Sequence, residues 1–177
     1  HLMRSQHDSI ITSSATIKKD NPNLNCRING LKMTSPRIII IDNHLKISMK
    51  SNVIKNNTII FYNKFNKKKI ELLKKAGVRT YKTTLNEKGD LNLKNVLIKI
   101  KKLGFYRIFL ESGITLASNF LKENLVNDLK IYISCNKINN NGSGSINKLF
   151  KLFLKNKKYN VEKVNLFGDK LISYKVK

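Results

Sequence analysis

Arginine, acidic residues, cysteine and histidine are all scarce in this chain of 177 residues. Only five of its 35 basic residues are arginines, and its 11 acidic residues leave a formal net charge of +24. Where lysine is so favoured, an arginine is expected at positions that need a planar, two-pronged donor for phosphate or carboxylate. Two of the five, Arg4 and Arg27, bracket a segment with few lysines. That segment is our candidate for substrate binding.

The two cysteines, Cys26 and Cys135, lie far apart, and neither belongs to a Cys-x-x-Cys spacing or has a pair of histidines nearby. This argues against a zinc site and is typical of a protein in a reducing cytosol. No apolar run approaches the roughly 18 residues that a membrane helix needs, and the first residues do not resemble a signal peptide. We therefore expect a cytoplasmic protein with no metal and no membrane partner.

The positive charge is spread along the chain rather than clustered. It accompanies 24 asparagines and 22 isoleucines, a bias that A/T-rich codons produce. No basic run is interleaved with aromatic residues in a stacking pattern, so nucleic acid is not the expected partner. A basic RNA-binding module, which gains affinity by neutralising phosphates, is kept as an alternative function.

Short β-branched runs alternate with longer helical patterns, and hydrophobic residues make up 41% of the chain. The helical patterns cover 67–76, 91–103 and about 115–124, and glycine follows the first two. The β-branched runs are nearly continuous in apolar character, which is typical of buried parallel strands. Together they predict an α/β domain with a mostly parallel sheet flanked by helices. The expected strands are Ser9–Thr12, Arg37–Asp42, Thr58–Tyr62, Val78–Lys82, Phe105–Leu110 and Leu129–Ser134.

The sequence pattern changes in the C-terminal part of the chain. Residues 136–145 are too polar to pack and predict a loop, and Lys148–Leu154 predicts a short helix. Tyr159–Leu166 and Lys170–Val176, separated by a Gly-containing turn, predict an antiparallel hairpin that finishes the sheet. Met33–Ser35 and Ser48–Asn57 are the other expected loops.

The strongest chemical signal lies where the strand Phe105–Leu110 ends in Glu111, followed by Gly113 and a helix. The first amides of a helix are unpaired and attract anions, and ligands of open α/β sheets gather beyond the carboxyl ends of the strands. Glu111 is thus expected to hold substrate hydroxyls, and the helix start to hold a cofactor phosphate. The alternative is that Ser112 or Thr115 merely caps the helix and Glu111 is a solvated turn residue.

The strand Ser9–Thr12 leads into the small residues 13–16, which allow a ligand to approach the backbone and offer hydroxyl groups. Residues 18–22 then predict a turn, in which Asp20 is suited to a ribose hydroxyl or to capping. Taken singly, Arg4 is better explained as a solvated helix-surface residue and Asp20 as a turn residue. Taken together with Arg27, this alternative weakens.

Five segments in this order resemble the reductase domain of the bifunctional riboflavin-biosynthesis deaminase/reductase. The resemblance covers nearly the whole chain and implies a dihydrofolate-reductase-like fold, NADPH as reductant, 5-amino-6-(5-phosphoribosylamino)uracil as substrate, and a homodimer. Hydride transfer to C1 of the opened ribosyl group would give the ribityl amine, although no residue is an obvious general acid. The segments are 3–16, 20–24 with Arg27, 36–42, 110–117 and 125–133.

The resemblance also implies roles for individual residues. Glu111 would orient the substrate as the catalytic residue, and Lys18, Lys19, Lys46 and Arg37 are open candidates for contacting the 2′-phosphate of NADPH. The family usually has Asp-Asp-Pro and often Glu-Gly-Gly where this chain has Asp20-Asn21-Pro22 and Glu111-Ser112-Gly113. The implied substrate residues are Arg4, Leu24, Arg27 and Glu111, and the implied NADPH residues are Thr16, Asp20, Asn43, Gly113, Ile114, Thr115, Leu116, Ala117, Ser118 and Asn119.

Two further family features have no match in the sequence. One is a first strand of the type Leu-Lys-x-Ala-x-Ser-Leu-Asp-Gly, and the other is the zinc signature of the deaminase domain. We therefore expect residues 1–177 to be a single reductase domain truncated at its N-terminus, unable to deaminate and reducing poorly or not at all alone. A non-catalytic reductase-like remnant is the remaining alternative.

Overall fold

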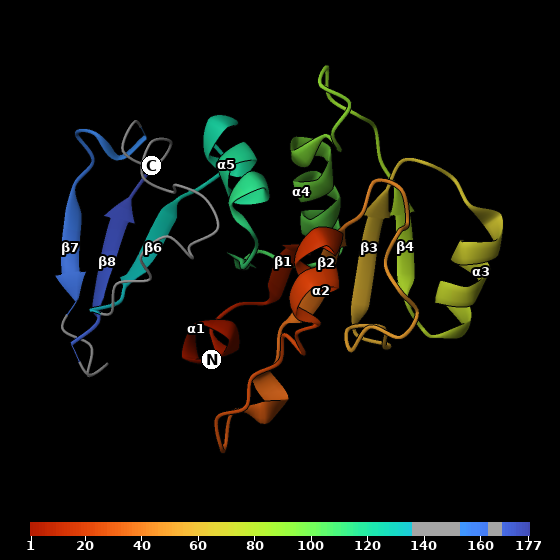
Figure 1. The fold of residues 1–177 in the computed structure, drawn as a ribbon, viewed down its shortest axis with the longest axis horizontal. Coiled ribbons are helices and arrows are strands. Elements are labelled where there is room, and N and C mark those ends of the chain that lie inside the picture. Colours follow the sequence, from red (N-terminus) through yellow and green to blue (C-terminus); the bar gives the residue numbers. More distant parts are fainter. Residues whose placement is uncertain (136–152, 163–167) are drawn as a thin grey trace. The chain divides into compact units, whose positions relative to one another are not determined.

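The computed structural model describes residues 1–135, 153–162 and 168–177 (Figure 1). The chain divides into two compact units, His1–Ala117 and Ser118–Lys177. The first contains a five-stranded sheet and the second a three-stranded sheet. The expected α/β class, with a parallel central sheet, helices and a C-terminal antiparallel hairpin, is confirmed.

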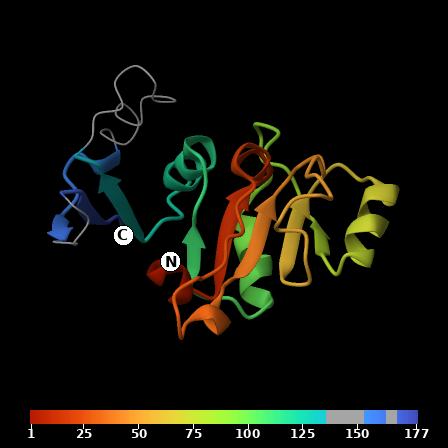
Figure 2. The same cartoon turned by 60° about the horizontal axis from the view of Figure 1, so that its bottom comes forward.

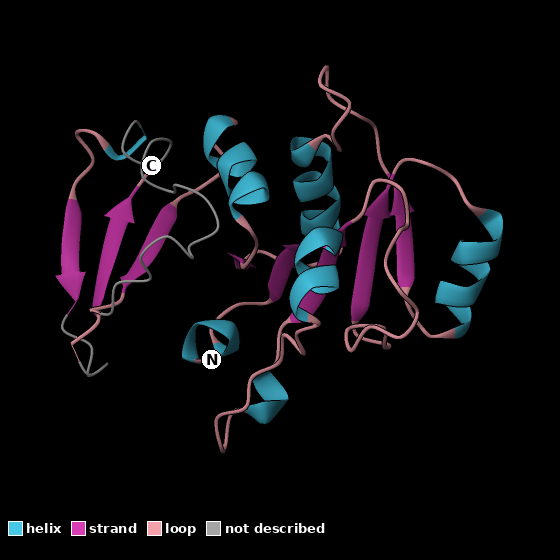
Figure 3. Cartoon of the chain, viewed as in Figure 1, coloured by secondary structure: helices cyan, strands magenta, loops and turns pink. Residues whose placement is uncertain are grey.

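Five parallel strands build the sheet of the first unit in the order β4-β3-β2-β1-β5 (Figure 3). All five residues of β3 are buried, and β1 and β2 are buried over most of their lengths. Because successive side chains point to opposite faces, such strands must be covered on both faces. The bounds are β1 (Ser9–Ser13), β2 (Arg37–Ile41), β3 (Thr58–Tyr62), β4 (Arg79–Lys82) and β5 (Ile108–Leu110).

Helices cover the two faces of this sheet. On one face, Ile10 and Ile38 belong to a core cluster with Ile17 of α2 (Ser14–Asp20) and Leu73 of α3 (Lys67–Lys75). On the other face, the ring of Phe61 lies 5.8 Å from that of Tyr81 between centroids. Lys99 of α4 (Leu93–Lys102) places its ammonium 4.6 Å from the Tyr81 centroid. Helices α2 and α3 therefore lie opposite α4.

Helices α3 and α4 begin and end close to where the sequence predicts. The side chains of Asn66 and Asn92 cap their first turns by accepting backbone N–H groups at 3.0 Å. Gly77 and Gly104 follow them with φ of +76° and +90°, a conformation that glycine adopts without strain. Leu72, one of the apolar residues of the predicted helical pattern, is 43% exposed.

The segment 13–22 differs from expectation. Residues 13–16 were expected to form an open approach and 18–22 a turn, but α2 runs from Ser14 to Asp20. Ser13 caps this helix through its hydroxyl, which accepts the N–H of Thr16 at 3.1 Å, and Ile17 buries its side chain. Capping and burial together outweigh the weak helix propensity of the threonine and isoleucine. Two other short helices, α1 (Leu2–Ser5) and η1 (Lys32–Thr34), are too brief to show a periodicity in sequence.

The second unit contains β6 (Asp128–Ile133), β7 (Tyr159–Glu162) and β8 (Lys170–Lys175). The predicted hairpin is confirmed, because β7 and β8 pair antiparallel. However, β6 pairs antiparallel with β8, so the hairpin continues this second sheet and not the five-stranded one. Grouping β6 with the buried parallel strands was wrong, since Asp128 and Lys130 alternate with Leu129 and Ile131 as in a half-exposed strand.

Helix α5 (Ile114–Lys122) spans the boundary between the units, and Leu116, Phe120 and Leu121 are buried in it as expected. The predicted loop 136–145 and most of the predicted helix 148–154 lie outside the described residues. Among the helices of the described ranges, none is long and apolar enough to cross a membrane.

Candidate active site

The order of the strands identifies one place in the first unit where ligands are expected. From β1 the chain adds β2, β3 and β4 on one side, and β5 then returns to the other side of β1 (Figure 2). In open parallel sheets, ligands bind beyond the carboxyl ends of the strands at such a reversal. Glu111 lies directly there, because its N–H donates to the carbonyl of Ile11 in β1 at 3.0 Å.

Arg4 and Glu111 form a two-pronged ion pair at this reversal. Arg4 Nε lies 2.9 Å from Glu111 Oε2, and Nη2 lies 2.6 Å from Oε1. The third nitrogen, Nη1, donates to the carbonyl of Asn25 at 3.0 Å. The side chain of Arg4 is 15% exposed and that of Glu111 is 38% exposed. Glu111 is therefore the ion-pair partner of a largely covered arginine, and not a freely solvated turn residue.

This pair defines what each group can still bind. Each guanidinium nitrogen of Arg4 has one acceptor, which uses three of its five N–H donors, so Nη1 and Nη2 each keep one N–H for an incoming phosphate. The carboxylate of Glu111 keeps unused lone pairs on its exposed side, and these can accept ligand hydroxyl groups. The geometry thus favours Glu111 as a contact for hydroxyls and Arg4 as the group that fixes its orientation.

Thr16 and Gly113 make a second link across the ends of β1 and β5. The N–H of Gly113 donates to Thr16 Oγ1 at 3.2 Å, and Thr16 Oγ1 also lies 3.0 Å from Ser13 Oγ. A Cβ added at Gly113 would meet only Thr16 Oγ1, at 3.8 Å. The backbone at Gly113 is therefore open to close approach. Both residues are among those for which the family resemblance implies contact with the cofactor.

The start of α5 offers unpaired amides next to this link. The helical ladder begins with Ala117 donating to the carbonyl of Gly113 at 3.3 Å. The N–H groups of Ile114, Thr115 and Leu116 therefore have no partner within the helix. Of the predicted run 113–119, Gly113, Ile114 and Thr115 are exposed, Leu116 and Ser118 are buried, and Ala117 and Asn119 are half-buried. The first three residues are therefore the most accessible part of the run.

Three other predicted residues are not joined to these two pairs by a described contact. Leu24 is only 2% exposed and belongs to the core cluster. Arg27 is exposed, and its Nε lies 3.3 Å from Nε2 of His1. Asp20 is exposed at the last residue of α2. Their assignments depend on the family resemblance and stay predictions.

Asn43 lies just beyond the carboxyl end of β2. Its amide group donates to the carbonyl of Gly89 at 3.2 Å. Its Oδ1 is buried and has no hydrogen-bond partner among the described residues. A buried acceptor without a partner is costly, so this oxygen is available to a ligand donor.

Sequence reasoning missed two residues that organise the site. Asn25 accepts a hydrogen bond from Arg4, and Asp42 is 3% exposed with its Oδ2 accepting the N–H of Ile47 at 2.8 Å. A single Asn in a loop or Asp after a strand resembles an ordinary turn residue, so no sequence signal distinguishes them.

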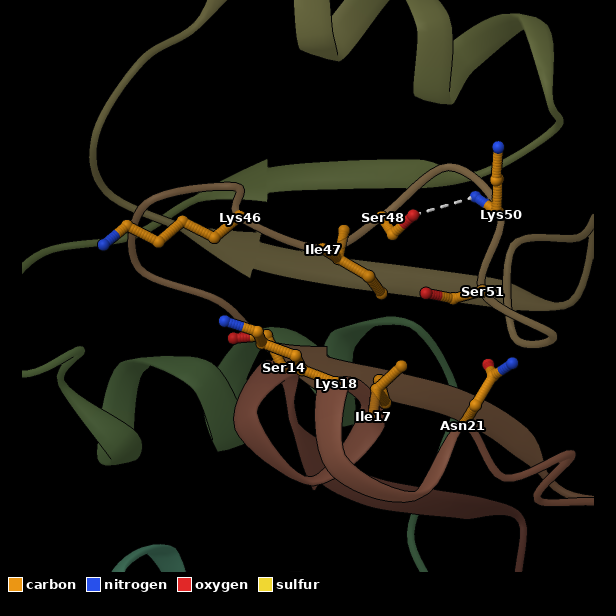
Figure 4. Close-up of a pocket in the computed structure, with 9 residues that line it drawn as sticks. All are labelled: Ser14, Ile17, Lys18, Asn21, Lys46, Ile47, Ser48, Lys50 and Ser51. Carbon is orange, nitrogen blue, oxygen red and sulfur yellow. Dashed lines mark hydrogen bonds between the residues drawn. The ribbon is translucent and has the colours of Figure 1, made fainter.

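A pocket of about 300 Å³ lies beside this region, between α2 and the segment that follows β2 (Figure 4). Within the part of the chain that the structure describes, no three His, Cys, Asp or Glu side chains are grouped as metal ligands. The pocket is lined by Ser14, Ile17, Lys18, Asn21, Lys46, Ile47, Ser48, Lys50 and Ser51.

A parallel sheet covered on both faces, with polar pairs at its reversal point, is the architecture of α/β proteins that bind nucleotides. The family described as the RibD C-terminal domain matches residues 1–137, and the chain belongs to this family.

One curated relative agrees with this assignment, and two solved structures share the fold. The riboflavin biosynthesis protein RibD of Aquifex aeolicus is 31% identical over 137 residues, which are 76% of this chain and 36% of that protein. The RibD structure of Acinetobacter baumannii matches 98% of this chain and 48% of its own, with a TM-score of 0.77 and 19% identity. A Thermotoga maritima structure described as a diaminohydroxyphosphoribosylaminopyrimidine deaminase/5-amino-6-(5-phosphoribosylamino)uracil reductase has a TM-score of 0.72 and 18% identity, over 99% of this chain and 47% of its own. The chain thus spans about half the length of these proteins or less.

Proposed function

We propose that this domain reduces the ribosyl group of 5-amino-6-(5-phosphoribosylamino)uracil to the ribityl product, with NADPH as the reductant. Membership of the RibD C-terminal domain family supports a role in riboflavin biosynthesis. The name of the Thermotoga maritima relative includes this reductase activity.

One observation carries the proposal. Two pairs of residues from distant parts of the sequence, Arg4 with Glu111 and Thr16 with Gly113, meet at the carboxyl ends of the adjacent strands β1 and β5. The first pair suits a substrate rich in hydroxyls and phosphate, and the second suits a dinucleotide backbone. The two ligand types would then lie beside each other, as transfer between them requires.

The residues at Gly113 fit the cofactor. Gly113 leaves its backbone open, Thr16 supplies a hydroxyl, and the start of α5 supplies N–H groups and a favourable dipole for a diphosphate. When bound, the nicotinamide supplies a hydride for C1 of the opened ribosyl group. The protein's part is to hold the two ligands in register and to limit the access of water.

Glu111 would act on the substrate. Its carboxylate would accept hydrogen bonds from the ribosyl hydroxyls, and its negative charge would favour positive charge that develops at the C1–nitrogen bond. Arg4 would hold this carboxylate in place and complete the binding of the 5-phosphate together with Arg27. Leu24, Asp20 and Asn43 complete the set of proposed contacts, the last through its unpaired Oδ1.

The test is a fluorescence titration of NADPH into the protein at two salt concentrations, followed by an assay of NADPH oxidation with and without the aminouracil substrate. We expect saturable NADPH binding that survives the higher salt. We also expect substrate-dependent oxidation, slow in residues 1–177 alone as the sequence predicts, that falls at least tenfold in Glu111→Gln with little change in NADPH affinity. A protein that folds but binds no NADPH would be a non-catalytic remnant. Binding of RNA that weakens steeply with salt would favour the nucleic-acid alternative.

A further inference from the structure

Two buried polar atoms without hydrogen-bond partners belong to neighbouring strands at the amino end of the five-stranded sheet. Ser9 is 0% exposed, and neither its Oγ nor the Nε of Arg37 has a partner among the described residues. Ser9 and Arg37 are paired in register across the parallel strands β1 and β2. Neighbouring strands lie about 4.8 Å apart, so one small ligand can reach both side chains.

Both side chains belong to the face of the sheet that α4 covers. The next residues along the two strands, Ile10 and Ile38, lie in the core cluster on the opposite face, and successive residues of a strand alternate between faces. The ring of Phe105 lies with its centroid 5.8 Å from Arg37 Cζ, and Arg37 Nη1 donates to the Asn56 carbonyl at 3.2 Å. The guanidinium is thus held from two sides, while its Nε has no acceptor.

Two arginines on this face lack a carboxylate partner. The registers of β2 with β3 and of β3 with β4 place Arg79 on the same face as Arg37. In the described ranges, Arg4 and Arg107 form ion pairs, but Arg37 and Arg79 do not. Burial, and to a lesser extent the positive charge of Arg79, lower the pKa of Arg37 below its ordinary value. A bound anion would oppose both effects, because it compensates a partly desolvated charge and offsets the repulsion between like charges.

We propose that Ser9 and Arg37 bind a small inorganic anion of the size of chloride, and that the charge of Arg79 adds to its attraction. The Ser9 hydroxyl and the Nε–H of Arg37 are both donors, and an anion accepts from both. Because both donor atoms are covered by protein, the ion has to be small. Arg37 as a whole is half-buried, so its exposed side offers a path from solvent. The proposal does not depend on the proposed reductase function.

Binding of this anion would stabilise the fold. An ion that binds the folded protein and not the unfolded chain raises the free energy of unfolding as its concentration exceeds its dissociation constant. The net charge of +24 also destabilises the compact state through self-repulsion, which a bound anion reduces. We therefore expect chloride to stabilise this protein beyond the general effect of ionic strength.

The first experiment measures urea unfolding while sodium gluconate is replaced stepwise by sodium chloride at constant ionic strength. Gluconate is too large for the site, so the parent should show a saturable rise of the urea midpoint by about 0.5 M. Ser9→Ala should lose most of this rise. The matched control is Thr12→Val, because Thr12 is also 0% exposed in β1 with an unpartnered hydroxyl, but faces α2 and α3. No rise in the parent, or equal rises in all three proteins, would overturn the proposal.

The second experiment locates the ion and separates it from an ordered water, which could also bond to both atoms. Crystals of the parent are soaked in sodium bromide, and the anomalous signal of bromide is mapped. We expect a peak within hydrogen-bond distance of Ser9 Oγ and Arg37 Nε that is absent in Ser9→Ala. Density without an anomalous signal would be water and would overturn the proposal. A peak without the chloride-dependent rise in solution would be an adventitious ion only, and would overturn it as well.

Discussion

The two ends of the five-stranded sheet both use the scarce arginines, but for different purposes. At the amino end, Arg37 begins β2, Arg79 begins β4, and Arg107 immediately precedes β5. Beyond the carboxyl end of β5, Arg4 reaches Glu111 from a short helix at the start of the chain. The same guanidinium group thus occurs at both ends of the sheet, but the groups that it contacts differ between the two ends.

At the amino end the arginines join segments of the fold. The guanidinium of Arg107 lies 3.2 Å from Asp8 Oδ1, and the backbone N–H groups of Tyr106 and Arg107 donate to Asp8 Oδ2 at 2.9 and 2.8 Å. The guanidinium of Arg37 lies 5.8 Å from the centroid of the Phe105 ring. These contacts join Asp8 to the connection into β5, and both oxygens of its 26% exposed carboxylate accept hydrogen bonds from residues 106 and 107.

At the carboxyl end, Arg4 holds a carboxylate that is still partly open to solvent. Arg4 and Arg107 both hold a carboxylate by two nitrogens, but only the pair at the carboxyl end lies where ligands of open parallel sheets bind. Changes at the amino end should therefore alter stability, and changes at the carboxyl end should alter binding.

The largest effect on stability is expected from substituting one of two glycines that lie at opposite ends of the five-stranded sheet. Gly77, two residues before β4, has φ of +76°, and a Cβ there would lie 1.6 Å from Asn56 Oδ1. Gly77→Ala should lower the free energy of unfolding by roughly 3 kcal/mol, because both strain and overlap act against it. Gly113→Ala should cost less than about 0.5 kcal/mol in stability and still weaken NADPH. Urea denaturation of both variants checks this, and similar losses of stability would contradict the contrast.

Arginine-to-lysine changes should have the next largest effect. Arg4→Lys keeps the charge but loses the two-pronged geometry, so substrate affinity should fall by roughly 2 kcal/mol while NADPH affinity barely changes. Arg107→Lys at the amino end should leave both affinities as in the parent. Calorimetric titration with the phosphoribosylaminouracil substrate measures the difference. Parent-like affinity in Arg4→Lys would make Arg4 a structural residue like Arg107.

A smaller effect should follow from Thr16→Val, which keeps the shape of the side chain and removes its hydroxyl. The N–H of Gly113 then loses its acceptor, and the link between α2 and the start of α5 is broken. We expect NADPH to bind more weakly by about 1 kcal/mol, with substrate affinity nearly unchanged. Replacing Thr34, whose hydroxyl donates to the Leu31 carbonyl at the exposed end of η1, by Val should affect neither ligand.

The smallest effect concerns pH. Hydrogen bonds from the backbone N–H groups of Arg107 and Tyr106, with a lesser contribution from the Arg107 guanidinium, lower the pKa of Asp8 below its ordinary value of 3.8. Because folding lowers the pKa of Asp8, its ionised carboxylate stabilises the folded protein at pH values above 3.8. This contribution is lost as the pH falls through the folded-state pKa. We therefore expect the free energy of unfolding, measured at a series of acidic pH values, to fall less steeply below about pH 4 in Asp8→Asn than in the parent. Identical slopes would show that Asp8 contributes nothing through its charge.

Much of the parallel sheet could be predicted from the sequence, because isoleucine-rich runs are a local signal. Strands β1 to β4 begin and end within one residue of expectation. The strand expected from Phe105 is described only from Ile108 to Leu110, since residues 106 and 107 use their N–H groups to bind Asp8. A partner 98 positions away in the sequence leaves no trace in a local pattern.

The candidate site also contains residues that the sequence could identify and contacts that it could not. Glu111 and Gly113 could be found from a strand end followed by a glycine and a helix, which are neighbours in the sequence. The pairing of Arg4 with Glu111 spans 107 positions, and the sequence alone could not show that the two residues meet. The basic pocket was not predicted, because one of its walls comes from an irregular segment without periodicity.

The central claim is that the cofactor lies at the carboxyl end of the sheet, between β1 and β5. Backbone amide NMR spectra recorded during a titration with NADPH test it most directly. We predict shifts of the amide signals of Thr16, Gly113 and the first turn of α5, with those of Arg37, Arg79 and Arg107 unchanged. Shifts confined to the amino end, or spread evenly over the exposed lysines, would contradict the account.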